Sequence, residues 1–81
     1  MSYIEKILAL STAHMPSTRP DFGGLRTAVF EYGVVVWVSE PGEGVPEWIT
    51  PAMTQAYEAE CTLVLFDADC NDDPSLQAWD W

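Results

Sequence analysis

The chain has 81 residues, 48% of them hydrophobic and 12% aromatic, a composition that excludes a disordered protein and fits one compact α+β domain over residues 1–81. Thirteen Asp and Glu face three Lys and Arg, for a net charge of −10, which excludes direct binding to nucleic acid because Lys and Arg supply most of the affinity for phosphates. No apolar run approaches the roughly 18 residues of a membrane span, so we expect no membrane insertion and a cytoplasmic location.

The first third of the chain predicts one strand and one short helix. The apolar positions within residues 3–10 favour a first strand. Thr18 followed by Pro20 is typical of a helix start, because a Thr can cap free N–H groups and a Pro is tolerated in the first turn. The glycines at 23 and 24 should keep that helix short.

The remaining elements follow from longer apolar patterns. Residues 28–39 are the strongest strand signal, and Gly33 makes them either one bent strand or two strands of a hairpin. Residues 40–46 are rich in turn formers. Thr50 and Pro51 repeat the cap-and-proline pattern before a helix over 51–61, and 62–66 reads as a central strand. We expect the tail, 74–81, to pack back through its tryptophans.

Together these elements predict an α+β fold in which a small, mainly antiparallel β-sheet carries one or two helices packed on one face. The side chains expected in its core are Ile4, Ile7, Leu8, Leu25, Val29, Val34, Val36, Val38, Trp48, Met53, Tyr57, Val64 and Phe66.

Two overlapping acidic motifs are candidates for a catalytic or a metal site. Asp67 and Asp69, after an apolar strand, resemble the first motif of haloacid-dehalogenase-type phosphotransferases, but that chemistry needs a lysine and further acids that do not follow. Asp67, Asp69 and Asn71 also match the first half of an EF-hand loop. The required glycine is replaced by Asp72 and the bidentate glutamate by Ala78, which leaves at most weak cation binding.

The other reactive side chains are isolated in the sequence. His14 is the only histidine and has no partner at metal or triad spacing. Cys61 and Cys70 have neither the spacing of a zinc or redox motif nor the density of a disulfide scaffold. We therefore expect no enzyme activity, no metal and no cofactor.

The negative charge is concentrated after Arg26. Of the thirteen carboxylates, Glu5 and Asp21 precede residue 27, which leaves eleven in residues 27–81 with no basic residue among them. Over about 30 Å, the expected diameter of the domain, duplex DNA presents about 18 phosphates, roughly half of them on one side. The acids can therefore imitate DNA toward a basic partner, and the expected contact set is Glu40, Glu43, Glu47, Glu58, Glu60, Asp67, Asp69, Asp72, Asp73 and Asp80.

Several short motifs resemble a family of small proteins of unknown function carried on plasmids and phages. They lie at residues 11–14 (STAH), 30–33 (FEYG), 36–38 (VWV), 66–69 (FDAD) and 79–81 (WDW). The resemblance implies an origin on a mobile element. Size, acidity and that origin are similar to those of the anti-CRISPR proteins, some of which mimic DNA and block a type I effector complex. The partner expected from it is a basic nucleic-acid-binding CRISPR effector in the host cytoplasm, bound by a monomer.

An alternative of another class uses the aromatic residues. In this hypothesis the domain is a protein-interaction or toxin-neutralising module whose apolar interface is made by Trp37, Trp48, Trp79 and Trp81, and the charge serves solubility. Salt separates the two hypotheses, because screening weakens a charged interface and hardly affects an apolar one.

Overall fold

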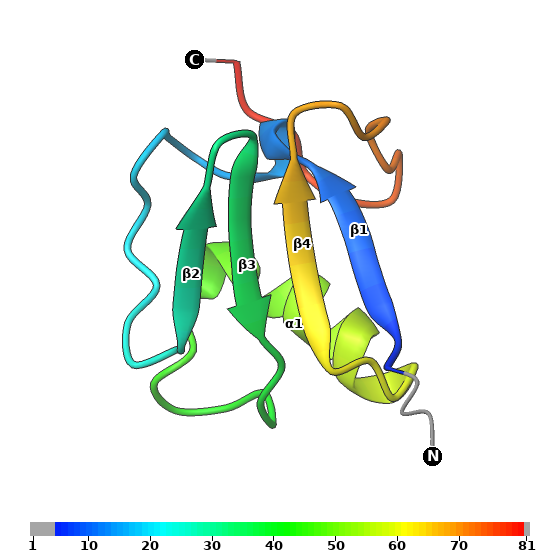
Figure 1. Ribbon diagram of the computed structural model, residues 1–81. Helices are drawn as coiled ribbons and strands as arrows, with labels where there is room; N and C mark the ends of the chain where they lie inside the picture. Colours follow the sequence, from blue (N-terminus) through cyan, green and yellow to red (C-terminus); the bar gives the residue numbers. More distant parts are fainter. Residues whose placement is uncertain (1–4, 81) are drawn as a thin grey trace.

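A computed structural model describes residues 5–80, in which a four-stranded sheet packs against a single α-helix (Figure 1). This is the predicted α+β fold, with its helix on one face of the sheet. The elements are β1 (Ile7–Ser11), η1 (Thr12–His14), β2 (Thr27–Phe30), β3 (Gly33–Trp37), η2 (Glu47–Ile49), α1 (Thr50–Glu58) and β4 (Leu63–Asp67), where η denotes a short 3-10 helix.

The strands lie in the order β1-β4-β3-β2, so β4 and β3 are central and β1 and β2 are the edges. β3 runs antiparallel to both β2 and β4, and β1 runs parallel to β4. Two of the three pairings are antiparallel, which confirms the mainly antiparallel sheet. The apolar run that predicted a central strand is β4, covered on both sides by neighbouring strands.

The long apolar run around Gly33 forms a hairpin, the second of the two predicted arrangements. β2 and β3 pair from Thr27 opposite Val36 to Phe30 opposite Gly33. A Cβ atom at Gly33 would overlap the carbonyl oxygen of Phe66 in β4. The glycine is therefore required by the close approach of a neighbouring strand.

The core lies between the sheet and α1. Alternate residues of β1, β3 and β4 point to this side and form one cluster with buried side chains of α1 and η2. The buried apolar residues are Leu10, Met15, Val34, Val36, Ile49, Ala52, Met53, Ala56, Val64 and Phe66.

Three of the predicted core residues are exposed. Ile7 is 51% exposed because it alternates with Leu8 and lies on the sheet face away from α1, and Val29 is 81% exposed because it lies on edge strand β2. Tyr57, in the last turn of α1, is 46% exposed. The prediction missed Leu10, Met15, Ile49, Ala52 and Ala56, and Ile4 lies outside the described residues.

The helix predicted at Thr18 is wrong, since residues 18–26 contain no helical turn. The Asp21 carboxylate accepts a hydrogen bond from the Gly23 N–H at 2.8 Å, and Gly23 has a φ of 58°. This local turn offers the backbone an alternative to the helix. The helical turn falls earlier, in η1, where the Ser11 hydroxyl accepts from the Ala13 N–H at 3.1 Å.

α1 starts near the predicted residue, but the Thr50 side chain does not cap it in the predicted way. The Thr50 hydroxyl donates to the Pro46 carbonyl at 2.9 Å, and the N-cap position is Ile49, which makes no side-chain cap. Pro51 occupies the first turn as expected. η2 runs directly into α1 and leaves no separate capping residue between them.

α1 ends in a Schellman motif that places Glu60 in an unfavourable conformation. The Cys61 N–H donates to the Ala56 carbonyl at 2.8 Å and the Glu60 N–H to the Tyr57 carbonyl at 3.1 Å. Glu60 has a φ of 61°, a left-handed conformation that glycine normally supplies at this position. Its carboxylate also lies at the negative end of the helix dipole.

Glu60→Gly should therefore stabilise the fold. Removing the left-handed strain and the carboxylate should raise the free energy of unfolding by about 1 to 2 kcal/mol, measured by urea denaturation. Glu60→Gln removes only the charge and should give the smaller part of this gain. If Glu60→Gly were no more stable than Glu60→Gln, the left-handed backbone conformation of Glu60 would not be strained.

Candidate functional site

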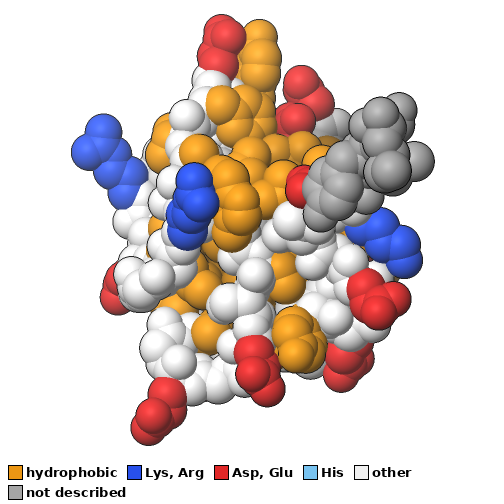
Figure 2. Space-filling model, turned by 60° about the horizontal axis from the view of Figure 1, so that its bottom comes forward, with side chains coloured by type: hydrophobic (Ala, Val, Ile, Leu, Met, Phe, Trp, Pro, Cys, Tyr) orange, Lys and Arg blue, Asp and Glu red, His pale blue; other side chains and the backbone are white. Residues whose placement is uncertain are grey.

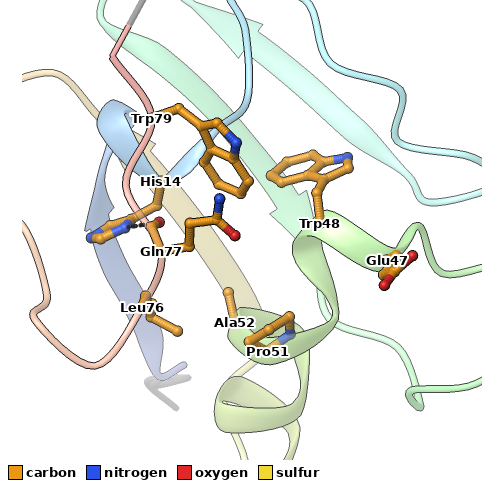
Figure 3. A pocket seen from close by; sticks show the side chains of 8 residues that line it. All are labelled: His14, Glu47, Trp48, Pro51, Ala52, Leu76, Gln77 and Trp79. Atoms are coloured by element: carbon orange, nitrogen blue, oxygen red, sulfur yellow. Dashed lines mark hydrogen bonds between the residues drawn. The ribbon is translucent and has the colours of Figure 1, made fainter.

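The C-terminal tail is fastened to the domain through His14. The side chain of His14 is 4% exposed, and its Nδ1 lies 2.8 Å from the Gln77 carbonyl oxygen (Figure 3). Its Nε2 accepts from the Asp73 N–H at 2.8 Å. Nδ1 therefore carries the proton and donates it to Gln77. With both ring nitrogens engaged, His14 holds the tail and offers no free base. No local pattern predicts this contact, because its partners lie 59 and 63 positions away.

A cavity of about 500 Å³ lies between this tail and the start of α1. Its lining includes Trp48, Trp79 and Glu47, with the two indole rings on one side of the opening (Figure 3). Trp48 is fixed, since its Nε1 donates to the Asp21 carbonyl at 2.7 Å and its ring meets Phe66 at 5.9 Å. The two tryptophans give the cavity an aromatic wall. Within residues 5–80 no group of three potential metal ligands occurs, so the cavity holds no candidate metal centre among the described residues.

Four of the predicted contact acids, Asp67, Asp69, Asp72 and Asp73, lie at the end of β4 and in the loop that follows it. Asp67 and Asp73 have structural tasks: the Asp67 carboxylate accepts from the Asp69 N–H at 2.9 Å, and the Asp73 carboxylate accepts from the Ser75 N–H at 2.9 Å and hydroxyl at 2.7 Å. Asp69 and Asp72 are exposed. Within the described loop, only Asp69 and Asp72 have carboxylates that accept no hydrogen bond from the loop itself.

Hydrogen bonds from the hydroxyl and the N–H of Ser75 hold the pKa of Asp73 below its ordinary value. A depressed pKa means that the folded state favours the carboxylate. The stability that this carboxylate contributes to the folded tail is fully present above the pKa that Asp73 has in the unfolded chain. It is lost as the pH falls through the lower pKa of the folded state.

Ser75→Ala should raise the pKa of Asp73 toward its ordinary value, because the hydroxyl is the largest cause of the shift. An NMR titration that follows the Asp73 side-chain carboxyl measures it. Ser75→Thr keeps a hydroxyl and should keep the low pKa. An unchanged titration midpoint in Ser75→Ala would show that the hydrogen bond does not set it.

Four further contact acids lie at the opposite end of the sheet. Glu40 and Glu43 follow the end of β3, and Glu58 and Glu60 precede the start of β4. All four are exposed. β3 ends beside the start of β4, with the Val38 N–H donating to the Thr62 carbonyl at 2.9 Å, so the two pairs share one end of the molecule.

The remaining two acids lie near the cavity: Glu47 lines it, and Asp80 follows Trp79, which also lines it. The ten acids therefore do not form one row. Eight lie in two groups at the two ends of β4. Cys61 and Cys70, both free thiols, are separated by the same strand.

The tryptophans of the alternative hypothesis do not all share one surface, because Trp48 and Trp79 line the cavity whereas Trp37 does not. Trp48 touches Phe66, on the core side of the sheet, whereas Trp37 pairs with Leu63 and lies on the opposite face. The guanidinium of Arg26 lies over the Trp37 ring, 4.5 Å from its centroid. Trp81 lies outside the described residues.

The sheet face away from α1 is apolar and uncovered by other described elements. The strand registers align Ala9, Leu65, Val35 and Ala28 across it. Figure 2 shows hydrophobic side chains gathered in one area, with most acidic side chains toward the margin. The sequence analysis left these four residues out of the predicted core but did not place them on one face, because the order of the strands depends on pairing between distant segments.

Comparison with models of protein families shows the family to which the chain belongs. Residues 7–81 match the C-terminal domain of the family of unknown function DUF5983. The chain belongs to this family. The DUF5983 match covers every element from β1 to the tail, so the cavity, both acidic groups and the open sheet face lie within the family domain. The origin on a mobile element and the likeness to anti-CRISPR proteins stay predictions.

Searches of curated proteins and of solved structures found no match to this DUF5983 domain. In residues 5–80 every helix is too short and too polar to cross a bilayer.

Proposed function

We propose that this domain is an inhibitor that mimics DNA and binds a basic nucleic-acid-binding surface, with a type I CRISPR effector complex as the expected partner. The observation that carries the proposal is the distribution of charge: eleven carboxylates and no basic residue follow Arg26. Eight of the ten expected contact acids are exposed, and only Asp67 and Asp73 are half-buried.

The basic side chains leave these acids available. Lys6 donates to the Ala59 carbonyl at 3.2 Å, and Arg26 lies over Trp37, so two of the three bases contact groups other than carboxylates. The two acidic groups lie at opposite ends of β4, and the phosphates of duplex DNA likewise border each groove on both sides. This arrangement favours imitation of two phosphate rows.

Competition for DNA at varied salt tests the proposal. In a mobility-shift assay, the domain should displace target duplex from a purified type I effector complex. Its affinity should fall at least tenfold between about 50 and 200 mM NaCl, since screening acts on every exposed charge pair. An unrelated basic protein serves as the control for unspecific attraction. Failure to displace DNA, or affinity indifferent to salt, would refute the mimicry.

The second candidate function is a protein-interaction or toxin-neutralising module, and the open sheet face favours it. The row from Ala9 to Ala28 and the neighbouring Trp37 would contact an apolar surface of a toxin from the same mobile element. The core of a protein interface is depleted in charge and enriched in aromatic residues. Association that persists unchanged in high salt would support this function over the first.

A further inference from the structure

The edge strand β2 has backbone groups that no described element uses. The Trp37 N–H donates to the Arg26 carbonyl at 3.0 Å, which makes these opposed residues a hydrogen-bonded pair. Antiparallel pairs alternate, so Ala28 and Phe30 also bond to β3, and the N–H and C=O groups of Thr27 and Val29 point away from the sheet. Within residues 5–80 no bond to these outward groups is recorded.

A groove of about 670 Å³ borders the same strand. One side is formed by residues 18–22, which run beside β2 in Figure 1, and the other by β2 and its turn. Phe22, the buried Met15 and Val34, and the exposed Val29 make most of the lining apolar. The volume lies within the range of ligand sites. Apolar pockets beside a free strand edge are the two parts of recognition by strand addition.

The charges around the groove select the occupant. Glu31, in the turn after β2, lines one end of the groove, and Arg19 lines it from the segment 18–22. Beyond the other end lie Glu40 and Glu43, which share a shallow depression with residues 24 and 25 just before β2. A segment lying along the strand would therefore meet carboxylates at both ends.

We infer that the β2 groove binds an extended peptide segment of a partner protein as a fifth strand. The segment is apolar at alternate positions, because every second side chain of an added strand faces the groove, and it carries Lys or Arg at both ends. The outward groups of Thr27 and Val29 bond to its backbone. The strand edge and the groove are separate from the proposed mimicry, which uses charge at the ends of β4, and the two sites share only Glu40 and Glu43.

The probe is the acetylated and amidated peptide RKVTVTVKR, titrated into the full chain at 150 mM NaCl by calorimetry and by NMR. We expect one-to-one binding with shift changes concentrated at residues 18–22 and 27–32. N-methylation of the valines keeps the charge and the side chains but removes hydrogen-bond donors, and it should weaken binding about tenfold or more. Equal binding of both peptides, or shifts confined to the acidic groups, would overturn the inference.

Two variants of the strand test its geometry. Val29→Asp should weaken binding about tenfold or more even though it adds attraction for a basic peptide, whereas Ala28→Asp adds the same charge on the opposite face and should not weaken it. Thr27→Pro removes an outward donor and should weaken binding while β2 stays paired. If Thr27→Pro does not fold, the Asp pair decides alone. Equal affinity of Val29→Asp and wild type, or dimerisation through β2 in place of peptide binding, would overturn the inference.

Discussion

Gly33→Ala is expected to unfold the domain or to lower its melting temperature by about 15 °C. The new methyl group would occupy the position of the Phe66 carbonyl oxygen, so β3 and β4 would have to separate at the centre of the sheet. Overpacking that moves backbone costs about 3 kcal/mol, a large share of the stability of a small domain. Thermal unfolding followed by circular dichroism measures the change.

Gly24→Ala is the matched control. A Cβ atom at Gly24 meets nothing within 4 Å, and its backbone lies outside the left-handed region. Reduced entropy of the unfolded chain should make this variant as stable as wild type, or about 0.4 to 1 kcal/mol more stable. If Gly33→Ala melted within a few degrees of Gly24→Ala, the close approach of β4 would not be what requires the glycine.

The fold was predictable where one local signal dominated. The β-branched run of β3 and the apolar run of β4 leave few alternatives to buried strands, and Pro51 marks the start of α1. The prediction failed where local signals competed. Thr18 and Pro20 favour a helix, but the Asp21 side chain bonds to the Gly23 backbone and forms a turn instead.

The sequence predicted that the acids of the candidate site are exposed, but it did not predict how the fold arranges them. Exposure of acids follows from the cost of burying a charge, and eight of ten are exposed. Their division between two ends depends on the antiparallel pairing of β3 with β4, which brings Glu40 near Glu58 across 18 positions of sequence. The carboxylates of Asp67 and Asp73 accept hydrogen bonds from the loop residues that follow them, and composition does not predict these turns.

Reversing the exposed acids is expected to abolish binding to the effector complex. The variant carries Lys at Asp69, Asp72, Glu40 and Glu43, and each replacement adds two charges, so the net charge changes from −10 to −2. Asp67 and Asp73 are kept because their carboxylates hold the loop after β4. The fold should be retained or stabilised, since thinning a like-charged surface relieves repulsion.

The position of the charge, and not only its sum, should decide the loss. Asp69→Lys with Asp72→Lys changes the net charge to −6, and so does Glu5→Lys with Glu31→Lys, which lies outside the contact set. The mimicry predicts that the first pair loses most competition with DNA, whereas the second loses only the small contribution of distant charges. Single neutralisations such as Asp72→Asn should each cost about 0.2 to 1 kcal/mol of binding, because exposed charges are well solvated. If both pairs weaken binding equally, attraction is unspecific, and if the quadruple variant folds and still displaces DNA, the apolar sheet face becomes the working surface.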